Sequence, residues 1–517
     1  MTIVRNVLAG TATKYVLLAV NVVLGVLLLP FTIQHLGTAD YGLWMLVVSL
    51  TYYFQLLDLG YGTGVVRHVC DADARGDIEM VNKVLSTFFV VFAGLGLVAA
   101  AGVAVLVVTV VPRFPNLTPD QIWKGQVVLA ILGARMAIGL PMTVFGAATT
   151  ARQRFALNNT VAVVVALVNG AVTYLVLSAG YGLVPLVAST ATVGIASYAA
   201  YVWTAKRAMP ELRLRPSSFS RPLVREVTSF SAYLFLISIA TQIGFNLDNL
   251  VIGAALGTSA VAIYAVASRI ADYQRQLCNQ FNGLLFPVVV RLDAAERAGA
   301  VREVMIDATR LALSLVTVVT ICVIAFGRPL IERWVGEGFE AAVLPLYALA
   351  AAGIVLVAQG PLGAVLLGTG RHRFVAYTAM GEALANLVLS VLLVRQFGIA
   401  GVAVGTAVPV FVANLGVLLP AACRQVNMPL VTFVRTVSRA PLAGAAPAAL
   451  VCAMLRTWAP AESLTAILLQ SALVGAVYVV ALYTIGLERE TRARYLRHLR
   501  HAVQATPLGA RLREAVP

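Results

Sequence analysis

Residues 84–111 read VLSTFFVVFAGLGLVAAAGVAVLVVTVV, a stretch that contains no charged residue. A run of 18 or more apolar residues can cross the ~30 Å hydrocarbon core of a bilayer as a helix. Similar runs recur along the whole chain of 517 residues, of which 60% are hydrophobic and 12% are charged. Soluble domains carry about 25% charged residues, and their mean hydropathy does not reach +0.87. We therefore predict an all-α, polytopic membrane protein and exclude a soluble enzyme with one buried helix.

The apolar runs divide into about 14 predicted transmembrane helices. Their approximate ranges are 15–34, 41–66, 84–111, 126–149, 158–178, 183–205, 227–256, 260–290, 305–327, 342–367, 375–394, 400–422, 437–455 and 463–486. The longest of these helices are expected to tilt, kink or extend beyond the lipid. Residues 1–14 precede a long apolar stretch that has no small-residue cleavage site, so we expect the first helix to be retained and not cleaved as a signal peptide.

The distribution of Lys and Arg predicts how the chain is oriented. With the N-terminus in the cytoplasm, the cytoplasmic segments hold 27 of the 38 basic residues, the external loops hold 6 and the helices hold 5. Short cytoplasmic loops of membrane proteins are enriched in Lys and Arg. Both termini are therefore predicted to lie in the cytoplasm, in a chain that spans the cell inner membrane. The same rule explains the net charge of +15 without a nucleic-acid partner.

The chain resembles itself at an offset near 220 residues. Leu36-Gly37-Thr38 corresponds to Leu256-Gly257-Thr258, and Arg154-Phe155 corresponds to Arg373-Phe374. Further matches are Pro141 with Pro361, Asn169 with Asn386, and Gly180 and Gly182 with Gly398 and Gly401. A repeat of six helices inserts in the same orientation both times. We therefore predict two parallel six-helix repeats followed by two C-terminal helices.

This pattern divides the chain into five predicted segments. They are an N-terminal six-helix repeat (1–205), a basic cytoplasmic linker (206–226), a C-terminal six-helix repeat (227–422), two additional transmembrane helices (423–486) and a basic cytoplasmic tail (487–517). The linker contains Pro210, Pro216 and Pro222, which favour non-helical structure. The Arg-rich tail is expected to contact anionic membrane lipids.

Two predicted helices carry unusually polar faces. In the range 227–256, Gln242, Asn246 and Asn249 follow i, i+4 and i+7 spacing, which places them on one face. In the range 260–290, one face carries Arg269, Asp272, Gln276, Asn279 and Gly283, with Arg275 beside it. Ionisable and amide side chains at membrane depth are costly when they face lipid. We expect both faces to line a wet cavity or to contact another polar helix.

Further ionisable residues lie in the apolar ranges. The acids Asp58, Asp248, Asp272 and Glu382 and the cation Arg135 fall within predicted helices. Several of these residues have a structural alternative. Asp272 can neutralise Arg269 or Arg275 as an i, i+3 pair, and Glu382 can pair with Arg371 or Arg373. Arg310 and Arg439 are expected to extend their side chains to the inner membrane surface. The glycines after Asp58 predict close helix packing or local unwinding.

The sequence predicts no metal or disulfide framework. The five cysteines are scattered and have no zinc-binding spacing, so we expect free thiols, and the five histidines form no cluster. We therefore expect no cofactor. Asp71-Ala72-Asp73 matches a short motif of nucleotide-sugar sites, but its position predicts a solvated loop.

These residues resemble the O-antigen (Wzx-type) flippases of the multidrug/oligosaccharidyl-lipid/polysaccharide (MOP) exporter superfamily along nearly all of the chain. In the first half the resemblance rests on Arg5-Asn6, Pro30, Leu36-Gly37, Tyr41-Gly42-Leu43-Trp44, Asp58-Leu59-Gly60-Tyr61-Gly62 and Arg67. In the second half it rests on Asp248, Gly253, Leu256-Gly257, Tyr264-Ala265-Val266-Ala267, Arg269-Ile270 and Pro287.

The resemblance implies a transporter and not an enzyme. It would move undecaprenyl-pyrophosphate-linked oligosaccharide from the cytoplasmic to the external leaflet, by alternating access coupled to an H⁺ or Na⁺ gradient, with other polysaccharide assembly proteins as partners. Arg binds phosphate oxygens bidentately. The implied headgroup-binding residues are Arg135, Arg269, Arg275, Gln242, Asn246, Gln276 and Asn279. The implied ion-coupling or cavity acids are Asp58, Asp248, Asp272 and Glu382.

Three other classes of protein remain open. A drug or cation antiporter of the same superfamily would be expected to have an acidic cavity, which the buried arginines disfavour. A membrane-bound polymerase or glycosyltransferase would usually have a large loop or catalytic domain, whereas the loops predicted here are short. A non-transporting component of a polysaccharide assembly complex would not need a polar face inside the membrane.

Overall fold

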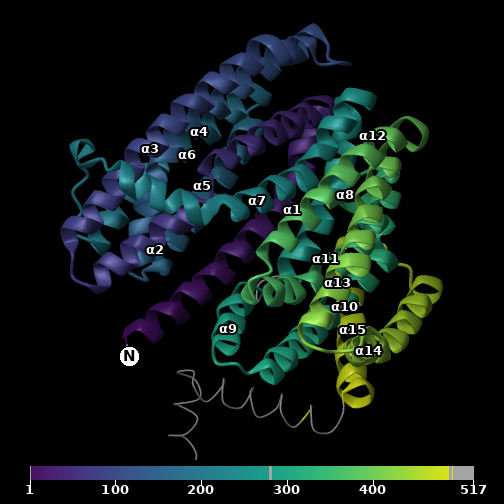
Figure 1. Cartoon of the computed structure of the whole chain (residues 1–517). Coiled ribbons are helices and arrows are strands. Elements are labelled where there is room, and N and C mark those ends of the chain that lie inside the picture. The colour runs from purple at the N-terminus through teal and green to yellow at the C-terminus, as the bar shows by residue number, and fades with distance from the viewer. Residues whose placement is uncertain (1, 279–281, 488–491, 493–517) are drawn as a thin grey trace, which may run out of the picture. The chain divides into compact units, whose positions relative to one another are not determined.

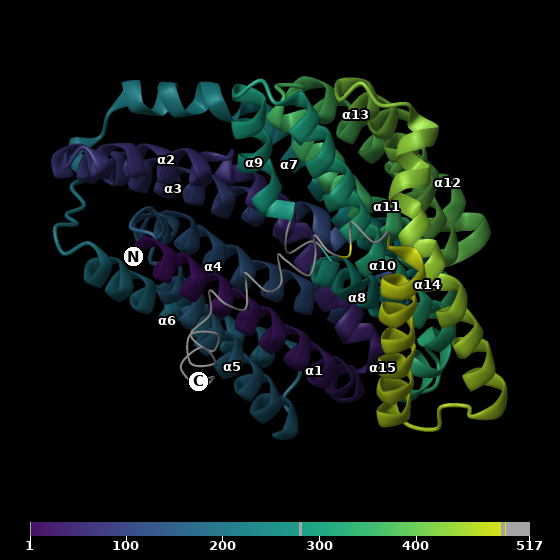
Figure 2. The same cartoon turned by 90° about the horizontal axis from the view of Figure 1, so that it is seen from below.

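The computed structural model of the chain describes residues 2–278, 282–487 and 492. Every regular element in these ranges is helical, and no strand occurs in them. The all-α prediction is therefore confirmed. Figures 1 and 2 show mostly long helices, the form that satisfies backbone hydrogen bonds inside a bilayer without help from neighbours. The five cysteines, all within the described ranges, are free thiols as predicted.

The α-helices account for most of the described chain. They are α1 (Thr2–Phe54), α2 (Tyr61–Ala74), α3 (Ile78–Val105), α4 (Pro119–Ala151), α5 (Phe155–Ser178), α6 (Leu183–Ala208), α7 (Arg221–Leu256), α8 (Thr258–Cys278), α9 (Asn282–Ala294), α10 (Ala298–Trp334), α11 (Val343–Gly368), α12 (His372–Phe411), α13 (Leu419–Gln425), α14 (Leu430–Trp458) and α15 (Leu464–Ala481). Short 3₁₀ or π segments lie between or beyond them: η1 (Gln55–Asp58), η2 (Leu106–Val110), η3 (Val111–Arg113), η4 (Pro216–Ser218), η5 (Glu340–Ala342), η6 (Val412–Leu418) and η7 (Leu482–Gly486).

Within the described residues, 11 helical segments are long and apolar enough to cross a membrane. Two of them, Ala9–Asp58 with 50 residues and His372–Gln425 with 54, are kinked at Gly37 and Gly398. About 20 residues cross a bilayer once, so each of these two segments is long enough for two spans. The 21 residues of α8 match a further predicted span, although the helix is polar. The chain is a multi-pass membrane protein, and its helices are consistent with about 14 spans.

The structure corrects one predicted span. The range 41–66, predicted as a single helix, is interrupted between η1 and α2. Leu59 and Gly60 both have left-handed backbone conformations, with φ of 50° and 74°. A right-handed helix cannot continue through two such residues. Of the two alternatives predicted at the glycine-rich segment, local unwinding is therefore present, and it places Asp58 at a helix break.

Backbone conformations with positive φ recur along the chain and agree with an internal repeat. Five pairs of residues, 217–220 positions apart, share this conformation: Gly37 and Gly257, Gly76 and Glu296, Asn116 and Gly336, Gln153 and Gly370, and Gly180 and Gly398. Each residue lies at a helix end, a turn or a kink. The order α2, α3, α4, α5 in the first half therefore corresponds to α9, α10, α11, α12 in the second. As predicted, α14 and α15 follow the second half.

The chain forms two compact units. The first contains residues 1–273, 334–349 and 372–413, and the second contains residues 274–333, 350–371 and 414–517. In the first unit α1 packs against α5, α4 packs against α3 and α6, and α7 packs against α12. In the second unit α14 packs against α15. Each unit combines separate stretches of chain, and the five predicted segments stay predictions.

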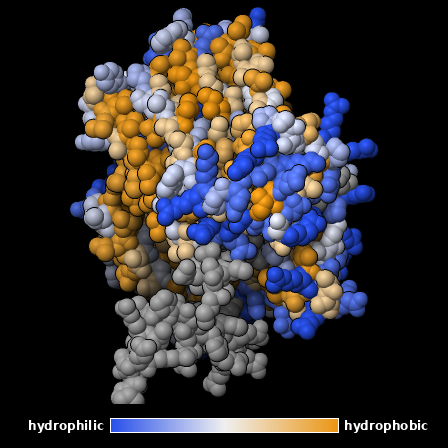
Figure 3. All heavy atoms as spheres, turned by 90° about the vertical axis from the view of Figure 1, so that its left-hand side faces the viewer, coloured by the Kyte–Doolittle hydropathy of each residue, from blue (hydrophilic) through white to orange (hydrophobic). Residues whose placement is uncertain are grey.

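The distribution of apolar side chains is that of a membrane protein. Phe88 and Phe92 of α3 pack with Tyr61 of α2 in a buried core, where the Tyr61 and Phe88 ring centroids are 5.4 Å apart. Other large apolar residues remain exposed, including Leu97 at 74% and Leu469 at 73%. On the face drawn in Figure 3, hydrophobic residues form a broad continuous area next to a separate hydrophilic area. Lipid can cover the first area and water the second.

The backbone conformation at the Gly37 kink can be tested by mutation. Gly37 has φ 78° and ψ 164°, a region that is almost restricted to glycine, and no atom lies within 4 Å of an added Cβ. Gly37→Ala should therefore lower the stability by about 1–3 kcal/mol through backbone strain alone. Thermal unfolding in detergent measures this, with Gly94→Ala as the control, because Gly94 is an exposed helical residue with equally open surroundings. Equal unfolding midpoints for the two variants would contradict the assigned kink.

Candidate functional site

Asp248 on α7 is a buried carboxylate at the meeting point of three helices, with a relative exposure of 5%. Tyr264 of α8 donates a hydrogen bond to its Oδ2. The Thr406 hydroxyl of α12 lies 3.2 Å from Oδ1 and 3.0 Å from Oδ2. Burying a carboxylate is costly unless donors replace its water. The two hydroxyls therefore give Asp248 a polar socket that only the packing of α7, α8 and α12 creates.

The amide side chains of α7 connect helices or bond to one another. Asn249 donates to Ser49 Oγ of α1 at 2.8 Å, next along the chain from Asp248. Gln242 accepts from Asn246 at 2.7 Å, which confirms that these two residues share a helix face. Asn386 of α12 donates to the carbonyl oxygen of Gly244 at 3.3 Å. The polar face of α7 therefore contacts α1 and α12 at several points.

Arg269 on α8 lies among tyrosines. Its half-buried side chain interacts electrostatically with Tyr41, Tyr52, Tyr273 and the acid Asp272. The Tyr273 hydroxyl packs on Gly25 of α1 so closely that an added Cβ there would collide with it. Phenol rings and hydroxyls can accommodate both a guanidinium and a polar ligand. The structure thus holds one predicted cation in a polar, partly buried site of the first unit.

Arg135 on α4 occupies a separate site. Its guanidinium packs against Gly194 of α6, where an added Cβ would lie 2.6 Å from the Arg135 Cζ atom. The Tyr198 hydroxyl donates to the Arg135 carbonyl oxygen at 3.2 Å, which ties the same two helices together. Among the described residues, the Arg135 guanidinium has no carboxylate within ion-pair distance. The missing side chain at Gly194 provides the space in which this cation lies.

Asp58 has a structural partner at the helix break. Its Oδ2 accepts a hydrogen bond from the Gly62 amide at 3.4 Å, in the first turn of α2. A carboxylate at a helix N-terminus satisfies backbone donors that have no partner within the helix. The geometry therefore indicates that Asp58 caps α2.

The remaining predicted residues are dispersed. Arg275 and Gln276 lie in the last turn of α8, within the second unit. Glu382 is half-buried on α12 in the first unit. Asn279 lies outside the described residues. The contacts of the first unit thus group Asp272 with Arg269 and place Arg135 and Asp248 in their own surroundings.

The sequence did not predict that part of the linker is fixed to α3. Asn82 donates to the Glu211 carbonyl oxygen and accepts from the Arg213 amide, at 3.0 and 2.7 Å. Ser86 and Thr87 accept from the backbone amides of Arg215 and Ser220, at 2.9 and 3.2 Å. The i, i+4 and i+5 spacing of these three polar residues was the available signal.

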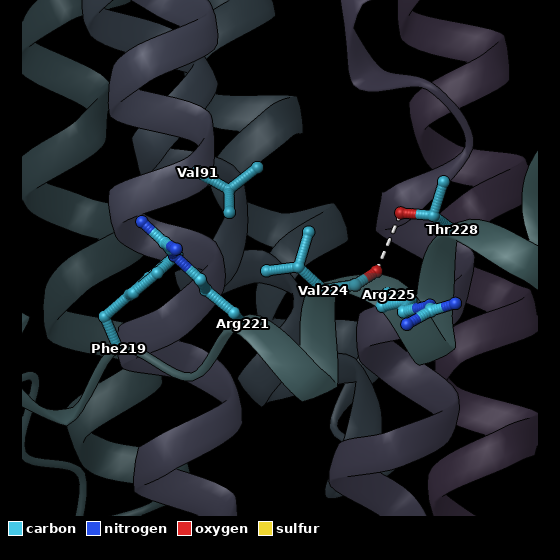
Figure 4. A pocket seen from close by; sticks show the side chains of 6 residues that line it. All are labelled: Val91, Phe219, Arg221, Val224, Arg225 and Thr228. Carbon is cyan, nitrogen blue, oxygen red and sulfur yellow. Dashed lines mark hydrogen bonds between the residues drawn. The ribbon is translucent and has the colours of Figure 1, made fainter.

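A cavity of about 540 Å³ lies where this linker enters α7. Figure 4 shows Arg221 and Arg225 projecting to opposite sides of Val224, with Val91 of α3 across the cavity. The Thr228 hydroxyl donates to the Val224 carbonyl oxygen at 2.7 Å, and it also bonds to Tyr61 of α2. The cavity lies between the linker, α3 and α7, and its lining combines apolar side chains with two arginines.

The fold is that of transporters in the MOP superfamily. It matches an inward-facing multidrug-resistance transporter of the MATE family in that superfamily with a TM-score of 0.67 and 14% identity, over 79% of this chain and 96% of that chain. It matches the lipid II flippase MurJ in an inward closed conformation with a TM-score of 0.68 and 14% identity, over 90% and 97% of the two chains. At these identities the likeness concerns the fold alone.

Residues 35–344 match the family model described as polysaccharide biosynthesis protein, and the chain belongs to this family. It is also 27% identical over 159 residues to the teichuronic acid biosynthesis protein TuaB of Bacillus subtilis (strain 168). That match spans 31% of this chain and 32% of the relative, so the chain aligns with about a third of that protein's length.

The socket around Asp248 predicts a measurable loss of stability. Tyr264→Phe removes one donor from a buried carboxylate, which costs about 1–3 kcal/mol. The variant should therefore unfold at a lower temperature in detergent than the parent protein. Tyr181→Phe is the matched control, because Tyr181 is 59% exposed. An unchanged midpoint for Tyr264→Phe would show that its hydroxyl does not support Asp248.

Proposed function

We propose that the protein is a flippase that moves a lipid-linked oligosaccharide from the cytoplasmic to the external leaflet of the cell inner membrane during polysaccharide biosynthesis. The family match over residues 35–344 carries this proposal. The fold shared with a lipid II flippase and with a multidrug transporter supports movement across the membrane as the activity. The distribution of basic residues supports cytoplasmic termini.

The arginines supply the anion-binding part of the proposal. A pyrophosphate linkage carries negative charge that must leave water when it enters the protein, and a guanidinium replaces water with paired donors. Arg135 and Arg269 are half-buried on different helices of the first unit, and the half-buried Arg275 lies six residues further along α8, in the second unit. A carrier of cationic drugs would gain nothing from these cations.

The buried acid Asp248 supplies a coupling element. A transporter changes state only when a ligand binds its conformations with different affinity. Uptake of H⁺ or Na⁺ by Asp248 would alter the hydroxyl network of Tyr264 and Thr406. The neighbouring residue Asn249 bonds to Ser49, which belongs to the first half of the chain. A change of charge at Asp248 would therefore act next to a contact between the two halves. Of the candidate acids, Asp58 caps a helix, Asp272 lies beside Arg269 and Glu382 is only half-buried, so the buried Asp248 is the strongest candidate.

Transport of undecaprenyl-pyrophosphate-linked oligosaccharide in proteoliposomes tests the role of the arginines. Arg269→Ala, Arg275→Ala and Arg135→Ala should each lower the initial rate by about tenfold or more, because each removes charge-assisted hydrogen bonds to phosphate. Gly194→Ala, which must displace the Arg135 guanidinium, should have an intermediate effect.

Arg113→Ala is the control for these variants. Arg113 is exposed at the end of η3 and donates to the Thr109 carbonyl oxygen, so its loss should leave transport unchanged. Parental transport rates in all three arginine variants, with normal insertion into the membrane, would reject a role of these arginines in binding the headgroup and with it the proposed cargo.

The coupling role of Asp248 has its own test. In Asp248→Asn, imposed H⁺ and Na⁺ gradients should no longer accelerate transport, so the ratio of rates with and without a gradient should fall towards one. Asp58→Asn should keep its gradient dependence, because that side chain bonds to the Gly62 amide at a helix end. Retained gradient dependence in Asp248→Asn would place the coupling site elsewhere.

A further inference from the structure

A cluster of arginines surrounds a cavity in the second unit, outside the transport site described above. Arg310 of α10 and Arg435 and Arg439 of α14 line a cavity of about 500 Å³, closed on another side by Gly486 and Leu487 at the end of η7. The three arginines come from helices more than 100 residues apart in sequence. Only the packing of α10, α14 and η7 brings them to one place.

Close helix packing fixes the walls of this cavity. Phe326 of α10, Cys452 of α14 and Tyr478 of α15 belong to one apolar core. An added Cβ at Gly444 would lie 2.9 Å from the Tyr478 ring, and one at Gly486 would lie 2.8 Å from the Ala440 carbonyl oxygen. The two glycines therefore let α14 and the α15–η7 segment approach closely, directly beside the arginines.

The charges around the cavity favour an anion. Arg435 and Arg439 are exposed and lie one turn apart on α14, an i, i+4 pair of like charges that repel. Arg310 is the most enclosed, with a side-chain exposure of 14%, and pairs with Asp307 of its own helix at 3.4 Å. Among the described residues that line the cavity, three are basic and none is acidic. A phosphate that enters this cavity would meet three guanidinium groups able to donate charge-assisted hydrogen bonds.

The length of the neighbouring helical segment indicates that the cavity lies at headgroup depth. Leu464–Gly486 has 23 residues, a length of about 35 Å as a helix, close to the ~30 Å hydrocarbon core. Its last residue, Gly486, therefore marks the membrane boundary, on the side that the charge distribution assigns to the cytoplasm. Apolar side chains beside the cavity remain exposed, including Val434 at 41%, Leu442 at 63% and Ile485 at 64%. An arginine-lined cavity next to exposed apolar side chains fits a phosphate with acyl chains attached.

We propose that this cavity binds the phosphate of an anionic phospholipid of the cytoplasmic leaflet. Basic pockets between transmembrane helices on the cytoplasmic side suit such headgroups. A lipid already present in the leaflet is held at a high effective concentration beside the cavity, which favours it over free phosphate. The bound lipid bridges α10 and α14 and stabilises the second unit. This role does not depend on the transported cargo.

Lipid binding to the purified full-length protein in zwitterionic nanodiscs tests the proposal. Phosphatidylglycerol should raise the thermal unfolding midpoint in a saturable manner. In Arg435→Ala/Arg439→Ala the apparent affinity should fall by about tenfold or more, because two charge-assisted contacts are lost. Arg328→Ala/Arg456→Ala, which removes the same charge from exposed positions of the second unit, should behave as the parent protein does.

A second variant and a competition with inorganic phosphate distinguish lipid binding from misfolding and from simple anion binding. Ser438→Glu adds a carboxylate to the cavity lining without removing an arginine, and it should also weaken phosphatidylglycerol binding if the double variant does not fold. Inorganic phosphate at millimolar concentration should neither raise the midpoint by itself nor displace the lipid. Unchanged lipid affinity in Ser438→Glu and in the folded double-arginine variant would overturn the proposal, as would equal stabilisation by inorganic phosphate.

Discussion

The bilayer gives a polypeptide no water with which to satisfy its backbone, and this constraint governs the whole structure. Helices therefore fill nearly all of the described chain. Interruptions occur where local residues permit them. Gly37, Gly257 and Gly398 adopt positive φ at a kink or between two helices, and Leu59 with Gly60 ends the helical run before α2. At that last break the side chain of Asp58 provides an acceptor for an amide that the helix leaves free.

The same constraint explains how polar side chains are distributed. Asn249, Asn386 and Asp248 bond across helix interfaces, and they contribute to holding α7 against α1, α8 and α12. Arg269 lies among tyrosines with Asp272, and Arg135 lies in the space left by Gly194. Half-buried cations in a membrane protein are costly, and they usually serve ligand binding or conformational change. The amide side chains bond to neighbouring helices, whereas Arg135 and Arg269 are cations that could bind an anionic ligand. The two arginines therefore support the proposal that the substrate is anionic.

α14 and α15, which follow the repeat, have a different role from the helices of the repeat. α14 and α15 pack with α10 through an apolar core and create a basic cavity at the membrane boundary. The repeat supplies the polar groups of the proposed transport path, whereas α14 and η7 supply most of the lining of the proposed lipid-binding cavity. Part of the linker is fixed to α3, because Asn82, Ser86 and Thr87 hydrogen-bond to its backbone.

The sequence by itself determined the membrane character, the approximate helix ranges, the two similar halves and the shared face of Gln242 and Asn246 on α7, because these depend on hydrophobicity, spacing and local backbone preference. Tertiary structure decided which polar residues meet. Tyr264 and Thr406 bond to Asp248 although they lie 16 and 158 residues from it in the sequence. No spacing rule predicts such contacts. For the same reason Arg310 and Arg439, predicted as independent surface-seeking residues, line one cavity. Helix rotation and the close approaches allowed by single glycines decide these contacts, and both arise only when the whole chain packs.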